Sequence, residues 1–221
     1  MEKSPLLRIG SALCSLLIIL SINGCAPVFS EMQDARTVGK NNVEGTASFS
    51  SAGFTTDGES DHLQNQVGFQ AAAGLSDAID LRLRYALVIV DDDILEDASV
   101  HVLAIGPKVS LIKDRLSVYL PVGFAFGDDV PEDANTWQIH PTLLGTIFVS
   151  DQLDINPSLK VLVPFEEDSD ITVAFNFGLG LRLNESFTLR PEFGVLVNPG
   201  EEGHFKQFGL GVTFQPSRKT D

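Results

Sequence analysis

Bulky apolar residues alternate with small or polar residues along most of the chain between residues 42 and 215. In residues 170–183, every second position from Ile171 onward carries Ile, Val, Phe or Leu, whereas the intervening positions carry small, polar or charged residues. A period of two is typical of β-strands, because successive side chains point to opposite faces. The pattern predicts ten strands, near residues 42–53, 65–75, 79–90, 99–112, 115–126, 136–149, 152–165, 170–183, 186–198 and 204–215.

Four segments repeat one pattern, in which a polar residue and an acid come before an alternating run. They begin at Ser76, Lys113, Ser150 and Asn184, so their separations are 37, 37 and 34 residues. A period near 36 that holds two strands and two turns indicates a β-hairpin repeat. A helical repeat would need apolar residues spaced by three and four, and the observed spacing is two.

The length of the predicted strands indicates a membrane. Most of them have eleven to fourteen residues, whereas strands of ordinary globular proteins have about five or six and a tilted membrane-spanning strand needs about nine to eleven. The pairing of a bulky apolar face with a small or charged face is typical of outer-membrane barrels if the apolar face points outward. Proline interrupts four of these strands, at Pro107, Pro141, Pro157 and Pro191, where the missing N–H predicts local bulges.

Short and long links alternate along the chain. The links at "SDA", "KDR", "SDQ" and "NES" have about three residues, and the intervening links, from "TTDGESDHLQ" to "PGEEG", have five to ten. This is the pattern of periplasmic turns and extracellular loops. With an even number of strands, we expect both the N-terminus and the C-terminus on the periplasmic side.

The alternating strands, the alternation of links and the terminal strand "FGLGVTF" resemble small bacterial outer-membrane β-barrel proteins. The resemblance implies an all-β fold, a single antiparallel up-and-down barrel of about ten strands, with eight as the alternative. It implies outer-membrane lipids and the barrel assembly machinery as partners. In such families an aromatic last residue assists insertion, whereas here Phe214 is followed by "QPSRKTD".

The N-terminus is similar to a bacterial lipoprotein signal peptide. Lys3 and Arg8 come before a short apolar stretch, and "INGC" resembles a lipobox that ends at Cys25. We therefore expect a signal peptide over residues 1–24, acylation of Cys25, a periplasmic tether over residues 25–41, a barrel over residues 42–215 and a tail over residues 216–221. The alternative is ordinary signal-peptidase cleavage nearby. Cys14 would be removed with the signal, so the mature chain could form no internal disulfide.

The net charge of -15 makes nucleic acid an unsuitable partner, because phosphate binding needs clustered Lys and Arg. Eighteen acids, and neither Lys nor Arg, lie in the five long links. They could attract cations or bind Ca²⁺ or Mg²⁺, with weak candidates at Asp91, Asp92, Asp93, Asp128 and Asp129. They could equally form a solvated surface. No stretch matches an EF-hand loop, and we expect neither a specific metal site nor a cofactor.

The polar strand faces would line the lumen. The candidates are Arg82, Arg84, Lys108, Tyr119, His140, Lys160, Arg182, Arg190 and Glu192, and the same faces carry the acids Glu44 and Asp154. Mixed charges could pair across the interior and fill it, since a wide aqueous channel needs about 16 strands. The alternative is a narrow, porin-like pore or a ligand site in which the cations meet a small anionic solute.

We expect a non-enzymatic structural or binding component, or a narrow pore. An outer-membrane hydrolase is an alternative, because His62, His101 and His204 would lie near the loops, but the loops are too short for a tall catalytic body. "IHPT" offers His140 and Thr142 without an adjacent Ser nucleophile. A further alternative is a soluble, lipid-anchored β-barrel lipoprotein, with its apolar side inward, that binds a small apolar ligand.

Overall fold

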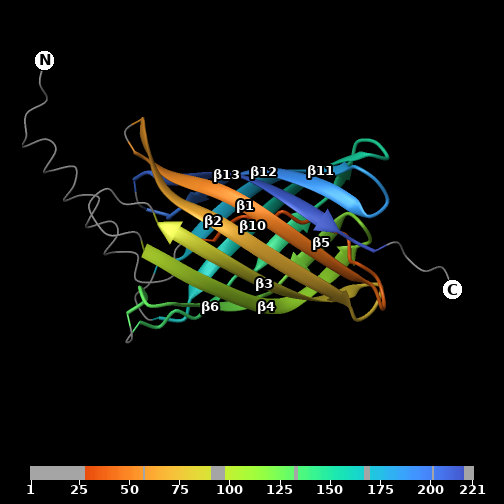
Figure 1. Ribbon diagram of the computed structural model, residues 1–221, viewed down its shortest axis with the longest axis horizontal. Coiled ribbons are helices and arrows are strands. Elements are labelled where there is room, and N and C mark those ends of the chain that lie inside the picture. The colour runs from red at the N-terminus through yellow and green to blue at the C-terminus, as the bar shows by residue number, and fades with distance from the viewer. Residues whose placement is uncertain are drawn as a thin grey trace, which may run out of the picture.

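The chain forms a closed antiparallel β-barrel (Figure 1). The computed structural model describes residues 28–56, 58–90, 98–131, 134–166, 170–200 and 202–216. The strands are β1 (Val43–Thr56), β2 (Glu59–Gly74), β3 (Ile79–Val90), β4 (Ala98–Ile112), β5 (Leu116–Tyr119), β6 (Val122–Phe126), β7 (Gln138–Ile139), β8 (Thr142–Gly145), β9 (Ile147–Phe148), β10 (Leu153–Pro164), β11 (Thr172–Arg182), β12 (Phe187–Val197) and β13 (His204–Phe214).

These thirteen strands form ten strand positions around the barrel wall, here called staves, because some short strands continue one another. β5 and β6 together form the fifth stave, and β7, β8 and β9 together form the sixth. Neighbours along the chain pair antiparallel, and β13 closes the barrel against β1 from Gly45↔Phe214 to Thr55↔His204. The prediction of an all-β, ten-stranded antiparallel barrel is confirmed.

Each of the four strand prolines coincides with a gap in the pairing with a neighbouring strand. β4 pairs with β6 as far as Ile105 and with β5 from Lys108, and so skips Pro107. The pairing skips Pro157 between β8 and β9, Pro191 between β11 and β12, and Pro141 between β7 and β8. Proline has no N–H to donate, so the pairing with this neighbouring strand is interrupted. On the opposite side of their strands, Pro107, Pro157 and Pro191 remain paired in register with the other neighbouring strand.

The two ends of the barrel differ in their links. At one end, here called the short-turn end, strands are joined by residues 75–78, 113–115, 149–152 and 183–186. The other end, the loop end, holds most of the longer links. The link between β1 and β2 is shorter than the ten residues expected, because β1 extends to Thr56 and β2 begins at Glu59. Gly58, with a φ of 81°, permits the tight turn.

The wall is apolar outside and polar inside. Large apolar side chains such as Phe175, Phe177 and Phe208 are exposed, whereas many charged side chains, Lys108 and Lys160 among them, are buried. This polarity is the reverse of a barrel with an apolar interior, so the alternative fold with the apolar side inward is wrong. The described residues include no helix of the length and apolar character needed to cross a membrane.

Candidate functional site: the occupied lumen

Part of the chain before β1 lies inside the barrel. Residues 28–38, here called the lumen segment, have no strand or helix, and all of them except Arg36 and Thr37 are buried. The sequence suggested a periplasmic tether over residues 25–41. Over residues 28–38 this prediction is wrong, because the segment finds polar and apolar partners inside the barrel. Residues 25–27 lie outside the described part of the chain.

The lumen segment crosses the barrel from one end to the other. Phe29 packs near the loop end against Ala52, Leu162, Ala174, Leu196 and Phe205, all close to the loop-end limits of their strands. Near the short-turn end, the Val38 N–H donates to the Asp80 carboxylate at 3.1 Å. The first described residue, Val28, therefore lies at the end opposite to Phe214. The prediction that both termini share one side concerns residues outside the described part of the chain.

Side chains of the wall satisfy the backbone of the lumen segment. A buried segment outside the sheet needs such partners, because an unpaired buried N–H or C=O is costly. Glu192 accepts from the N–H groups of Glu31, at 2.8 Å, and Met32, at 2.6 Å. The carbonyls of residues 29, 31 and 34 accept from the side chains of Asn176, Gln70 and Lys108, at 2.8, 2.8 and 2.9 Å.

Two carboxylates of the lumen segment meet cations of the wall. Lys160 Nζ lies 2.5 Å from Glu31 Oε1, and Arg84 Nη1 lies 3.8 Å from the same atom. Asp34 Oδ2 lies 3.0 Å from Arg190 Nη2. Breaking a buried pair by removing one partner leaves an uncompensated charge, which is strongly destabilising. These contacts therefore tie the middle of the segment to β3, β10 and β12.

Further ion pairs join the wall to itself and to Arg36. Arg82 pairs with Glu44 at 3.3 Å and with Asp80 at 3.4 Å. Near the short-turn end, Asp154 Oδ2 accepts from both Arg36 and Arg182, each at 2.8 Å. The interior thus holds a network of ion pairs to which the lumen segment contributes Glu31, Asp34 and Arg36.

Two glycines leave room for the segment. A Cβ atom added at Gly209 would lie 2.2 Å from Met32 Cε and 2.7 Å from Ser50 Cβ. At Gly211 an added Cβ would lie 3.1 Å from Met32 Sδ. The small residues on the lumen face of β13 therefore let Met32 pack directly against the wall.

The sequence-predicted lumen residues are nearly all buried inside the barrel. Those that are buried are Arg82, Arg84, Lys108, Tyr119, His140, Lys160, Arg190 and Glu192. Arg182 is the exception, because its side chain is 29% exposed near the short-turn end. Tyr119 packs with Ala35 and Leu144.

The lumen segment supplies partners that were not predicted from the sequence, chiefly Glu31, Asp34 and Arg36. A signal for them was present. The charged residues assigned to the lumen were six cations but only three acids, Glu44, Asp154 and Glu192. Such an excess of buried cations needs further acids, because buried charges are paired.

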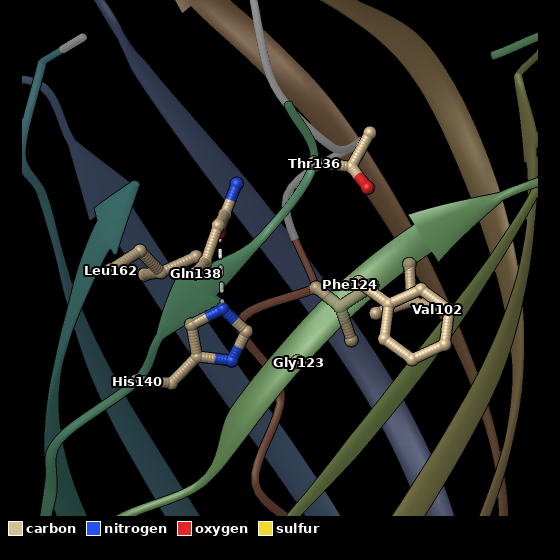
Figure 2. A pocket seen from close by; sticks show the side chains of 8 residues that line it. Val102, Gly123, Phe124, Thr136, Gln138, His140 and Leu162 are labelled. Atoms are coloured by element: carbon tan, nitrogen blue, oxygen red, sulfur yellow. Dashed lines mark hydrogen bonds between the residues drawn. The ribbon is translucent and has the colours of Figure 1, made fainter. Parts of the chain in front are cut away.

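A small cavity lies beside the lumen segment near the loop end (Figure 2). It is lined by Val28, Val102, Gly123, Phe124, Thr136, Gln138, His140 and Leu162, and it has about the size that one water molecule needs. His140 Nε2 lies 3.0 Å from Gln138 Oε1. Thr142 Oγ1 donates to the His140 carbonyl at 2.9 Å, so its hydroxyl is directed to the backbone and not to the imidazole.

Two other histidines and one loop acid make hydrogen bonds near the loop end of the barrel. His101 Nδ1 lies 2.8 Å from the Tyr85 hydroxyl, and His62 Nδ1 lies 3.3 Å from Ser51 Oγ. Asp129 accepts from the Ser99 N–H at 2.8 Å. Asp91, Asp92 and Asp93 lie outside the described residues. Within the described ranges, His, Cys, Asp and Glu form no group of three or more that could hold a metal ion.

Comparisons with known proteins identify the fold. No protein-family model matches the sequence, and no curated protein matches it. An outer membrane channel of Pseudomonas putida is similar over 85% of this chain and 100% of its own, with 10% identity and a TM-score of 0.52. The translocator domain of the autotransporter NalP from Neisseria meningitidis is similar over 79% of this chain and 88% of its own, with 8% identity and a TM-score of 0.47. At these identities the likeness concerns the fold, and this chain has the fold of bacterial outer-membrane β-barrels.

Proposed function

We propose that this protein is a non-enzymatic barrel of the bacterial outer membrane that its own N-terminal segment holds closed. It acts as a membrane-embedded structural or binding component and conducts no solute while residues 28–38 occupy the lumen. The observation that carries this proposal is the burial of the lumen segment from Val28 to Val38, with its backbone and its carboxylates bound by the wall.

The outer surface supports a position in the membrane. The eleven residues of β11, at a rise of about 3.4 Å and a tilt of about 45°, span roughly 26 Å, close to the apolar band of outer-membrane barrels. Aromatic pairs lie near both ends of the wall. Phe124 and Trp137 lie 4.7 Å apart near the loop end, and Phe187 and Phe214 lie 5.1 Å apart near the short-turn end. Aromatic girdles at these heights are typical of membrane interfaces.

The proposal is tested with purified protein in detergent and in planar lipid bilayers. We expect the unboiled protein to migrate differently from the boiled protein on a gel, because the closed barrel survives detergent. We expect no steady conductance from the unmodified chain. Absence of a mobility shift would refute the barrel in its membrane form, and a constant open conductance would refute the closed lumen.

Acylation of Cys25 belongs to the same proposal as a second attachment. Mass spectrometry of the mature protein tests it, since a lipid-modified N-terminal cysteine has a characteristic added mass. We expect the Cys25→Ala protein to stay in the membrane fraction, because the wall itself supplies the apolar surface. A Cys25→Ala protein that is soluble without detergent would contradict the membrane barrel.

A further inference from the structure

The lumen segment occupies the barrel as an anion. Four buried cations of the wall, Arg84, Lys108, Lys160 and Arg190, contact it through its carboxylates or carbonyl oxygens. We infer that the lumen, once the segment leaves it, is an anion-selective passage for small solutes that carry carboxylate-like or phosphate-like oxygens. This inference rests on the proposed function, because it takes the barrel to be closed in the membrane.

The acids of the wall cannot neutralise all of these cations. Asp80 and Glu44 are already paired with Arg82, and Asp154 is paired with Arg182. Glu192 is a further wall acid that lies beside the segment, and it accepts from the backbone N–H groups of Glu31 and Met32. One arginine offsets only one of its two acids, so the wall sets six cations against four acids, which leaves the middle of the empty lumen positive. The six cations are Arg82, Arg84, Lys108, Lys160, Arg182 and Arg190, and the four acids are Glu44, Asp80, Asp154 and Glu192.

Further donors are available to a bound anion. Within the described part of the chain, Arg82 Nε and Arg190 Nη1 are buried and have no hydrogen-bond partner. Both guanidinium groups present planar donors suited to oxygen anions. Their side chains come from β3 and β12, so a solute between these staves could reach donors from two sides of the lumen.

The space that the segment fills is wide enough for small solutes. An extended chain occupies roughly 5 Å in the direction of neighbouring strands and about 10 Å between stacked faces. Removal of the lumen segment would open a passage of about this cross-section. Toward the loop end, the passage would be lined by the apolar residues that now surround Phe29, among them Ala52, Leu196 and Phe205.

The segment is built as an insert and not as a strand of the wall. It adds no strand to the sheet. Side chains of the wall make many of its contacts, and within the described residues it is joined covalently to the wall only through residues 39–42 before β1. Its departure would therefore leave the ladder of the barrel intact, which is what a gate requires.

Two variants open the passage by different routes. In Glu31→Lys/Asp34→Lys, the new cations would face Lys160 and Arg190, so that like charges expel the segment. In the second variant, residues 28–38 are deleted. The control is Asp151→Lys/Glu185→Lys, which makes the same charge change on exposed short turns. Heat-dependent gel mobility selects the folded barrels for measurement.

Reversal potentials in a planar bilayer under a KCl gradient measure the selectivity. We expect both folded variants to conduct and to prefer chloride over potassium by at least about threefold, the effect of one unit charge about 7 Å away across water. The control should stay closed. Adding Lys160→Glu to either open variant should lower the preference, whereas adding Lys113→Glu on an exposed turn should not.

The inference is overturned if a folded opened barrel carries no current, if it prefers potassium, or if Lys160→Glu and Lys113→Glu act alike. Failure of the proposed function would be recognised separately. In that case the unmodified chain would itself conduct, or it would show no heat-dependent mobility.

Discussion

Replacement of Phe29 by Ala should loosen the lumen segment more than any other single truncation of an apolar side chain in it. Phe29 is fully buried in a cluster with Ala52, Leu162, Ala174, Leu196 and Phe205. Truncation of a buried Phe to Ala costs about 3–5 kcal/mol, because transfer free energy is lost and a cavity is left. The lost free energy destabilises the packing of the segment in the lumen, since hydrogen bonds between neighbouring strands hold the wall together.

Amide hydrogen exchange of the segment measures this effect. If the segment opens locally, its opening free energy falls by the same amount, and exchange of the Glu31 and Met32 N–H groups should accelerate by about 10² to 5 × 10³-fold. The matched control is Phe208→Ala on the same barrel, where the side chain is 64% exposed on the outer face. We expect that control to leave exchange at residues 31 and 32 unchanged.

Equal exchange in the two variants would refute the reasoning. It would mean that burial of the Phe29 ring does not hold the segment in the lumen. Faster exchange throughout the barrel in the Phe29→Ala variant would also refute it, because the segment would then open only together with the wall.

Three further predictions concern the same segment and its path. Gly209→Val should displace Met32, because even a Cβ at this position would lie 2.2 Å from Met32 Cε, and the variant should show intermittent conductance where the unmodified chain shows none. Glu192→Gln keeps the shape but removes a charge that accepts two N–H groups, and faster exchange by about tenfold or more is expected at those two groups. An epitope placed directly before Val28 should be accessible to antibody on the same side as one between β12 and β13, whereas an epitope after β13 should be accessible on the opposite side. Detection of the first epitope together with the third would contradict the path through the lumen.

The strands could be predicted from the sequence because alternation is a local property. Each of the ten predicted ranges overlaps a stave of the barrel, and the face that carries Phe175 and Phe177 in β11 is the outer face. The prolines marked gaps in the pairing for a similarly local reason, since the missing N–H depends on the residue itself. The interruption of the fifth stave at residues 120 and 121, and the tight turn after β1, were not anticipated.

The lumen segment could not be predicted in the same way. Residues 28–38 have no period of two, and their partners lie far away in the sequence. Glu31 meets Glu192 and Lys160, and Asp34 meets Arg190, across separations of more than a hundred residues. The excess of cations assigned to the lumen indicated that acids were lacking, but not where they would come from.

The sequence by itself therefore determined the wall: its strands, its outward apolar face and its inward charges, all of which follow from the period of the chain and from the solvent on each side. Only the tertiary structure decided what fills the lumen. The closed barrel brings β3, β4, β10 and β12 around one space, and their cations together bind a segment that none of these strands could bind alone.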